Sequence, residues 1–335
     1  MDCNCGALSH HFIIFRNRVE GCIYCGSERS KLLFELRDIF LDKYQLRECE
    51  NCETSFLHPK PNSDQLTRAY RDDYYGEGET KFNPLVERVI DFFRKRNAKK
   101  IAKIVNFKGR VLDIGCGNGK LLQNIGTCGN FELHGLELPS KSAERASKIK
   151  EIELHIGALK PETYLPNSFD LITLIHVFEH LENPKDIIEI IESIIKKNGI
   201  LIVEFPNLAS WQAKFFKQNW LHLDPPRHLN FFKPEQFKRI LNQVGFVLIQ
   251  EKYFSPQFSP FGVQQSILNT FLAKRDVLYE YLKGNKAYTK PYSRLNIQLQ
   301  VIFHWLSFPF FIATDMIASF FKRGGTIRFI FKKND

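Results

Sequence analysis

Short apolar runs alternate with amphipathic stretches along most of the chain after residue 84. Seven runs have the length and character of strands: RVLDIG, FELHGLEL, IELHIG, SFDLITLIHVFEHL, NGILIVEFPN, GFVLIQEKYF and TIRFIFKK. Stretches with apolar residues at helical spacing, such as 84–107 and 184–197, lie between them. This alternation predicts an α/β fold with a doubly wound, mainly parallel sheet, closed by an antiparallel strand at 326–333.

A largely helical insertion is predicted at 258–323, before the last strand. Its segment 301–321 is long enough to cross a bilayer, but His304, Pro309 and Asp315 argue against a span. On a helix, one side of this segment carries His304, Ser307, Phe311, Asp315, Ala318 and Lys322. The other side carries Trp305, Phe308, Ile312, Met316 and Phe320. Basic residues follow the segment, so two readings stay open: an interfacial helix on an anionic leaflet, or a helix buried against the sheet or a dimer partner.

Two CxxC pairs near the N-terminus predict a structural zinc site. The four thiolates would come from Cys22, Cys25, Cys49 and Cys52, which is a tetrahedral set with no open position for water or substrate. A zinc-ribbon domain is therefore expected over 1–60, followed by a linker or cap over 61–83 and by the main domain over 84–335. A second group of possible ligands, Cys3, Cys5, His10 and His11, is expected to bind no metal.

Composition narrows the class of protein without identifying a partner. The chain has 335 residues, 44% of them hydrophobic, which indicates a globular protein of about two domains. The opening MDCNCGALSHH carries no secretory signal, so a reducing, cytoplasmic setting is expected. A net charge of +10 is compatible with nucleic acid, an anionic membrane surface, a phosphorylated substrate or simply solvated lysines.

The stretch RVLDIGCGNGKLLQNI contains the clearest chemical signal. Gly115, Gly117 and Gly119 form a GxGxG turn between a strand and a helix, where the backbone can approach a ligand closely. Lys120 stands where a dinucleotide fingerprint prefers Gly or Ala, and Asp113 would repel a pyrophosphate but suits an ammonium group. Glu137 ends the next strand, where an acid can accept hydrogen bonds from both ribose hydroxyls.

These motifs, with SFDLITLIHVFEHL, GILIVEFPN and HLNFFKPEQFKRILNQVGF, resemble class I S-adenosylmethionine-dependent methyltransferases over residues 84–254. The resemblance implies a seven-stranded Rossmann-like sheet and S-adenosylmethionine as the cofactor. It also implies roles for single residues: the methionine moiety on Asp113 and on the loop 115–119, which includes Cys116, the ribose on Glu137 and the adenine against Leu138. Ala158 would contribute backbone to adenine recognition, and His176 would face the methyl or carboxylate end of the cofactor.

A hydroxyl acceptor would need a general base, for which histidine is suited near neutral pH. His228, in PPRHLNFF, is the first candidate and His176 the second, and either could instead serve only structure. Other candidates are Glu179, His180 and His222. The HxxEH sequence at 176–180 is similar to an ExxEH motif of metal-assisted methyltransferases, so a catalytic divalent ion stays an alternative.

The acceptor is the least determined part of the prediction. The zinc segment together with WLHLDPPRHL resembles a bacterial subgroup associated with cell-envelope polysaccharides. It implies O-methylation of a sugar on an envelope glycan or a lipid-linked precursor, with the enzyme in the cytoplasm or peripheral on the inner face of the membrane. The alternatives are an RNA methyltransferase and a noncatalytic module that binds cofactor or recruits a partner. An aromatic platform for stacking bases is not recognisable, which disfavours RNA. The oligomeric state is left open.

Overall fold

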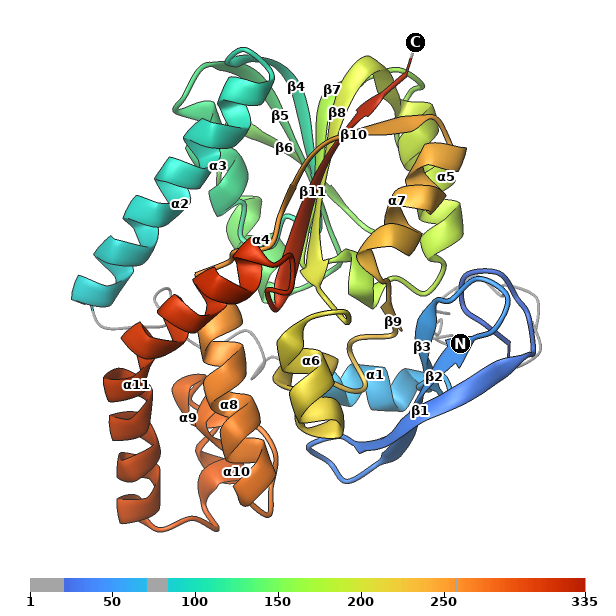
Figure 1. Ribbon diagram of the computed structural model, residues 1–335. Coiled ribbons are helices and arrows are strands. Elements are labelled where there is room, and N and C mark those ends of the chain that lie inside the picture. The colour runs from blue at the N-terminus through green and yellow to red at the C-terminus, as the bar shows by residue number, and fades with distance from the viewer. Residues whose placement is uncertain (1–20, 71–83, 257, 335) are drawn as a thin grey trace, which may run out of the picture.

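A seven-stranded sheet forms the centre of the molecule (Figure 1). The computed structural model describes residues 21–70, 84–256 and 258–334, with side chains throughout except at 84–93 and 286. Strand order in the sheet is β10-β11-β8-β7-β4-β5-β6. The strands are β4 (Lys108–Ile114), β5 (Asn130–Glu137), β6 (Ile152–Ile156), β7 (Phe169–Ile175), β8 (Ile195–Pro206), β10 (Phe246–Lys252) and β11 (Thr326–Lys333).

The pairing confirms the predicted fold class. β4, β5, β6, β7 and β8 are parallel neighbours, while β11 runs antiparallel to both β8 and β10. β11 therefore lies between β10 and β8, two strands that precede the helical insertion in the sequence. One boundary differs from the sequence pattern: α5 (Pro184–Ile194) stops three residues early, because Ile195 is already extended and pairs with Phe169 of β7.

Helices cover both faces of the sheet. α2 (Pro84–Ile104) and α3 (Lys120–Gly126) lie on one face, and α5 and α7 (Pro234–Gln243) lie on the other (Figure 1). The chain has 31 phenylalanines. Some of them form an aromatic layer on the second face: Phe178, Phe205, Phe232, Phe237, Phe329 and Phe331. Fully burying such a ring stabilises the fold by roughly 1.5–3 kcal/mol, so this layer anchors the strand ends near the site.

The N-terminal segment forms a second, four-stranded antiparallel sheet. Its strands are β1 (Ser30–Arg37), β2 (Lys43–Cys49), β3 (Ser55–His58) and β9 (Asn230–Phe231), and α1 (Ser63–Ala69) follows β3. β9 comes from the main domain, and Phe231 shares a core with Trp220, Tyr44 and Leu46. The N-terminal segment is thus joined to residues 220–231 by both backbone pairing and packing. The predicted domain limits stay a prediction, and residues 1–20 and 71–83 lie outside the described part.

The insertion between β10 and β11 is helical, as predicted. It consists of α8 (Ser259–Phe271), α9 (Val277–Leu282), α10 (Lys286–Thr289) and α11 (Arg294–Phe320). α6 (Trp211–Phe216) and α4 (Lys141–Ala146) are short helices after β8 and β5. The insertion and the N-terminal sheet both lie at the end of the central sheet where the parallel strands finish (Figure 1).

Candidate functional site

The glycine-rich loop connects the end of β4 to the start of α3. Gly115, Gly117 and Gly119 all have positive φ angles, of 71°, 56° and 74°, which side chains rarely tolerate. A Cβ at Gly115 would lie 2.4 Å from the Val177 side chain, so the loop is packed tightly on that side. A Cβ at Gly117 would meet nothing within 4 Å, so the backbone there borders open space. The loop can therefore bring main-chain groups against a ligand.

Two acids, the buried Asp113 and the half-buried Glu137, stand behind this loop. Asp113 accepts a hydrogen bond from the Thr173 hydroxyl (2.6 Å), and Glu137 accepts hydrogen bonds from the backbone N–H groups of Gly117 (2.7 Å) and Leu138 (3.1 Å). Burial raises the pKa of Asp113 to about 7, opposed by the Thr173 bond and helped by the charge of Glu137. Burial also raises the pKa of Glu137. Among the described residues no Lys or Arg forms an ion pair with either carboxylate, so the pair suits a ligand that brings its own positive charge.

Exposed apolar side chains flank the acids at the ends of β5 and β6. Leu138 is 58% exposed and Ile156 is 50% exposed, and Ile156 pairs in register with Glu137. Ala158 is also exposed, one residue after Gly157, whose N–H donates to the Glu137 carbonyl (2.9 Å). Cys116 is buried under the loop, against Gly135. The surfaces present fit the parts of S-adenosylmethionine: carboxylates for its ammonium, sulfonium and ribose, and apolar surface for its adenine.

His176 lies next to this loop, at the end of β7, in a left-handed backbone conformation (φ 55°). Its Nδ1 is 3.2 Å from Glu179 Oε1, its Nε2 is 3.4 Å from Glu204 Oε1, and its ring rests on Phe258. Burial alone would lower the pKa of His176, but the two carboxylates outweigh it and raise the pKa to about 9. His176 is therefore protonated at neutral pH, a charge state that does not favour it as a general base.

The contacts of the His228 ring differ from those of His176. His228 Nδ1 lies 2.8 Å from the His222 carbonyl oxygen, which only accepts hydrogen bonds, so in the neutral ring Nδ1 carries the proton and Nε2 the lone pair. Nε2 lies 3.9 Å from Glu179 Oε1 and 3.9 Å from Asp224 Oδ2. Those carboxylates would stabilise an imidazolium formed when Nε2 accepts a proton. The geometry thus supports His228 over His176 as the proton acceptor.

His180 and His222 are half-buried neighbours of His228 and are neutral at pH 7. Burial lowers the pKa of His180 to about 4 and that of His222 to about 3. His180 Nδ1 lies 2.9 Å from the Arg227 carbonyl oxygen, and His222 packs against Gly262 of α8. Their positions tie the 3-10 helix Phe178–His180 to the segment 221–230, which carries His228.

The family-model comparison matches residues 82–251 to a methyltransferase domain. The chain belongs to this family. The matched range contains the glycine loop and His176, His180, His222 and His228, and the predicted methyltransferase family is confirmed.

Individual relatives are more distant. The chain is 22% identical over 155 residues to a ubiquinone biosynthesis O-methyltransferase of Burkholderia pseudomallei, a match covering 43% of this chain and 66% of that protein. It is 27% identical over 156 residues to the protein of that name in Neisseria meningitidis, with the same coverage of 43% and 66%. The chain thus spans just under two thirds of the length of these relatives. Among solved structures, Haemonchus contortus phosphoethanolamine N-methyltransferase 2 in complex with S-adenosyl-L-methionine is similar, at 17% identity and a TM-score of 0.46 over 72% of this chain and 53% of that one.

The metal alternative takes a different form in the methyltransferase domain from the one predicted. Ligand atoms of Glu179, His180 and His228 all lie within 4.8 Å of one another, whereas His176 is not part of this group. Glu179 Oε2 is buried without a hydrogen-bond partner. Two histidines and a carboxylate are a suitable donor set for a divalent ion, so this alternative now rests on His228 rather than on the HxxEH spacing.

The four cysteines predicted to bind zinc converge at one point. Cys22 Sγ lies 3.5 Å from Cys52 Sγ, Cys25 Sγ lies 3.6 Å from Cys49 Sγ, and all four sulfurs lie within 4.8 Å of one another. In a tetrahedral site with Zn–S bonds of about 2.3 Å, sulfurs are separated by about 3.8 Å. The thiol set therefore fits zinc in both donor type and spacing. The other proposed group, from Cys3 to His11, lies outside the described residues.

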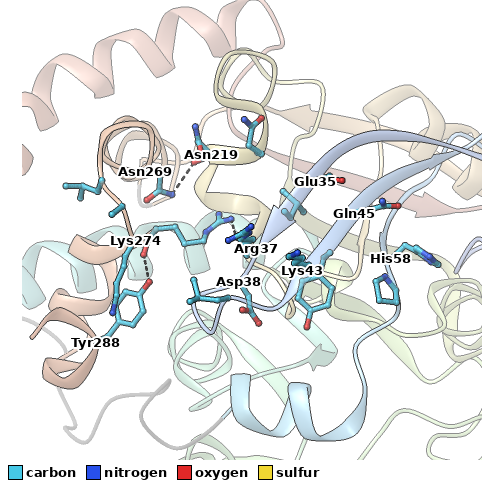
Figure 2. Close-up of a pocket in the computed structure, with 18 residues that line it drawn as sticks. Glu35, Arg37, Asp38, Lys43, Gln45, His58, Asn219, Asn269, Lys274 and Tyr288 are labelled. Atoms are coloured by element: carbon cyan, nitrogen blue, oxygen red, sulfur yellow. Dashed lines mark hydrogen bonds between the residues drawn. The ribbon is translucent and has the colours of Figure 1, made fainter. Parts of the chain in front are cut away.

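A cavity of about 770 Å³ lies away from these residues, between the N-terminal sheet and the helical insertion (Figure 2). Its walls come from β1 and β2 on one side and from the α8–α9 connection on the other, with Arg37, Lys43 and Lys274 among the residues that line it. It contains none of the predicted catalytic or cofactor-binding residues. The glycine loop and this cavity are thus two separate candidate ligand sites.

Several residues that contact the predicted site residues were not predicted from the sequence. Thr173, Glu204, Arg328 and Phe258 lie far along the chain from the motifs they contact, and Arg328 forms an ion pair with Glu204 across neighbouring strands. Thr173 had one available signal: it is a polar residue inside the apolar run that precedes His176.

Proposed function

We propose that this protein is an S-adenosylmethionine-dependent methyltransferase that transfers a methyl group to an oxygen atom. The observation that carries the proposal is the pair of acids, the buried Asp113 and the half-buried Glu137, behind an open glycine loop, with no Lys or Arg paired to either in the described part of the chain. A carboxylate that is removed from water without a cationic partner destabilises the folded protein, and a cationic ligand removes this free-energy penalty. The family membership and the similarity to ubiquinone biosynthesis O-methyltransferases support the same conclusion.

The residues of the site have separate tasks in this proposal. When bound, S-adenosylmethionine supplies an activated methyl group. Asp113 and Glu137 hold its charged and ribose groups, and the loop at Gly117 lets the backbone approach it. Because the methyl group is already activated, the protein mainly aligns the acceptor oxygen with it.

His228 completes the transfer. Its Nε2 accepts the hydroxyl proton as the new O–CH₃ bond forms and the S–CH₃ bond breaks, which leaves a methyl ether and S-adenosylhomocysteine. Glu179 and Asp224 balance the imidazolium charge. Protonated His176 keeps Glu179 ionised and in place, so we assign it a positioning role. If Glu179, His180 and His228 hold a divalent ion instead, turnover will depend on added Mg²⁺ or Mn²⁺.

For the acceptor we propose a sugar hydroxyl on an envelope glycan or on a lipid-linked precursor, modified in the cytoplasm. Glu179 Oε2 has no hydrogen-bond partner and can accept a bond from an acceptor hydroxyl. The subgroup resemblance of the zinc segment supports the same class of acceptor. We also propose that Cys22, Cys25, Cys49 and Cys52 bind one zinc ion that stabilises the N-terminal sheet.

Labelling tests the acceptor class. The purified chain is incubated with radiolabelled methyl donor and a lysate of its source cells, beside the Asp113→Ala variant, and label is counted in lipid, polysaccharide, RNA and protein fractions. Label in lipid or polysaccharide that the variant loses is the expected result. Label in RNA would replace the sugar acceptor with a nucleic acid, and no label in any fraction would favour a noncatalytic module.

A further inference from the structure

Helix α11 turns its polar side chains toward the protein. The side chains of Gln300 and Asp315 are buried, and the backbone carbonyl of His304 and the hydroxyl of Ser307 each accept a hydrogen bond from Gln264 of α8 (both 2.8 Å). His304 Nδ1 also lies 2.8 Å from Gln264 Oε1. A surface helix of a protein in water normally buries its apolar side instead.

The outward side of α11 is apolar along its whole length. Its members are each more than half exposed and recur at intervals that place them on one stripe: Leu295, Leu299, Ile302, Leu306, Phe310, Ile317 and Phe320. No charged residue occurs in the sequence between Arg294 and Asp315. By length and composition α11 could cross a bilayer, and little of it is buried inside the protein. We call these seven residues the outward stripe.

An aromatic and basic region adjoins the C-terminal end of the stripe. The rings of Phe321 and Trp211 lie 5.6 Å apart, and Phe215 on α6 is 80% exposed. Lys214 and Lys217 are exposed beside these rings in the sequence of α6 and the turn after it, and neither forms an ion pair within the described part of the chain. Aromatic rings with nearby lysines are typical of the headgroup region of an anionic membrane.

Both ends of α11 are fastened to the same folded unit. Its N-terminal end follows the short helices α9 and α10, and the helix runs along α8 (Figure 1). Near its C-terminal end, Ser319 Oγ donates to the Tyr253 carbonyl (2.8 Å), and β11 enters the central sheet six residues after the helix ends. A helix held at both ends on one side cannot carry its ends to opposite faces of a bilayer, so it would lie in the membrane plane.

We propose that the outward stripe docks on an anionic lipid bilayer, with α11 in the plane of the interface. A second copy of the chain fits less well, because the stripe has basic residues at both ends. Lys290 and Arg294 are exposed at one end, and Lys214 and Lys217 are exposed near the other. A parallel or an antiparallel pair of these helices would bring like charges together at each end, whereas anionic lipids offer the opposite charge.

The docked helix would also place the reaction site near the membrane. Asp315 near the end of α11 is buried, and Ser319 contacts Tyr253, two residues before Ser255. Ser255 Oγ donates to Glu204 Oε1 (3.3 Å), and Phe258 packs on His176. A lipid-linked acceptor could therefore approach from the bilayer surface. This consequence rests on the proposed function, but the docking itself does not.

Vesicle binding tests the docking without cofactor or acceptor. The full chain is mixed with vesicles of phosphatidylcholine alone or with 30% phosphatidylglycerol added, and the bound fraction is measured by flotation. Leu306→Gln is compared with Leu165→Gln, since the two leucines are 78% and 76% exposed and only Leu306 belongs to the stripe. We expect Leu306→Gln to weaken binding about ten-fold and Leu165→Gln to leave it unchanged.

A second pair of variants tests the charge. Lys214→Gln with Lys217→Gln should weaken binding to anionic vesicles by more than about ten-fold and leave binding to neutral vesicles unchanged. Thermal unfolding confirms that each variant is folded. Absence of vesicle binding by the wild type, or equal effects of the two leucine variants, would overturn the proposal. A wild-type dimer in sedimentation that Leu306→Gln dissociates, with no vesicle binding, would show that a second copy covers the stripe.

Discussion

Replacing Asp113 by Asn should stabilise the free protein and at the same time remove cofactor binding. Asp113 is buried, and its Oδ1 accepts a hydrogen bond from Thr173 that an Asn oxygen can equally accept. The substitution removes a carboxylate whose ionisation is disfavoured by burial and by the charge of Glu137. The same charge is what we propose holds the cofactor.

The size of the effect follows from the pKa of about 7 for Asp113 in the folded chain. An unfolded chain has a pKa near 3.9 at this residue, so the difference is about 3 units, or roughly 4 kcal/mol at high pH. Because the folded pKa is the higher one, the wild type loses this stability as pH rises from about 4 to about 7. For a chain of this length, 4 kcal/mol corresponds to roughly 5 °C in Tm.

Thermal unfolding of the wild type and Asp113→Asn between pH 5 and pH 8 measures this directly. The variant should unfold at higher temperature, with the larger gain at pH 8, and added S-adenosylmethionine should raise the Tm of the wild type only. Asp170→Asn is the matched control on β7, because Asp170 is paired with Lys196 (2.7 Å) and its replacement should not stabilise. A variant that is less stable at pH 8, or equally stabilised at pH 5 and pH 8, would refute the reasoning.

Three further predictions concern the histidines and the cysteines. His228→Ala should lower kcat on the order of 10²-fold or more with an unchanged Kd for S-adenosylmethionine in calorimetry, and an unchanged kcat would reject His228 as the base. The pKa of His176 is raised to about 9 in the folded chain. Its contribution to the free energy of unfolding, roughly 3 kcal/mol, is therefore complete below pH 6.5 and is lost as the pH rises toward 9. His176→Gln should lower Tm more at pH 6 than at pH 9.5. Metal analysis should find one zinc per chain. Cys49→Ser should lose the zinc and unfold at a lower temperature, whereas Cys128→Ser should keep the zinc and the wild-type Tm.

The central sheet, and the meeting of Asp113 and Glu137 at its edge, could be predicted because their signals are local. β4, the glycine turn and the start of α3 occupy one short stretch, and Asp113 and Glu137 end two neighbouring strands. In a parallel sheet such strand ends meet at one edge, so sequence order alone placed the acids together. The four cysteines were likewise indicated by their paired spacing.

Contacts between distant segments could not be predicted in this way. The pKa of His176 depends on Glu204, which in turn is paired with Arg328, and neither position has a periodic signal. The pairing of β9 with β3 joins residues far apart in the chain. For α11 the predicted apolar side is only partly the outward one: Phe320 lies in the outward stripe, whereas Phe308 and Ile312 are half-buried. Only the hydrogen bonds to Gln264 of α8 show that the side with His304 and Ser307 faces inward.

Photo-crosslinking of radiolabelled S-adenosylmethionine to the intact protein, followed by peptide mapping, locates the cofactor site. We predict label in peptides that contain the loop 113–119 or the strand ends 137–138 and 156–158, and loss of that label in Asp113→Asn. Label in peptides that line the cavity of Figure 2, such as 35–45 or 269–275, would contradict this prediction and place the cofactor between the N-terminal sheet and the insertion.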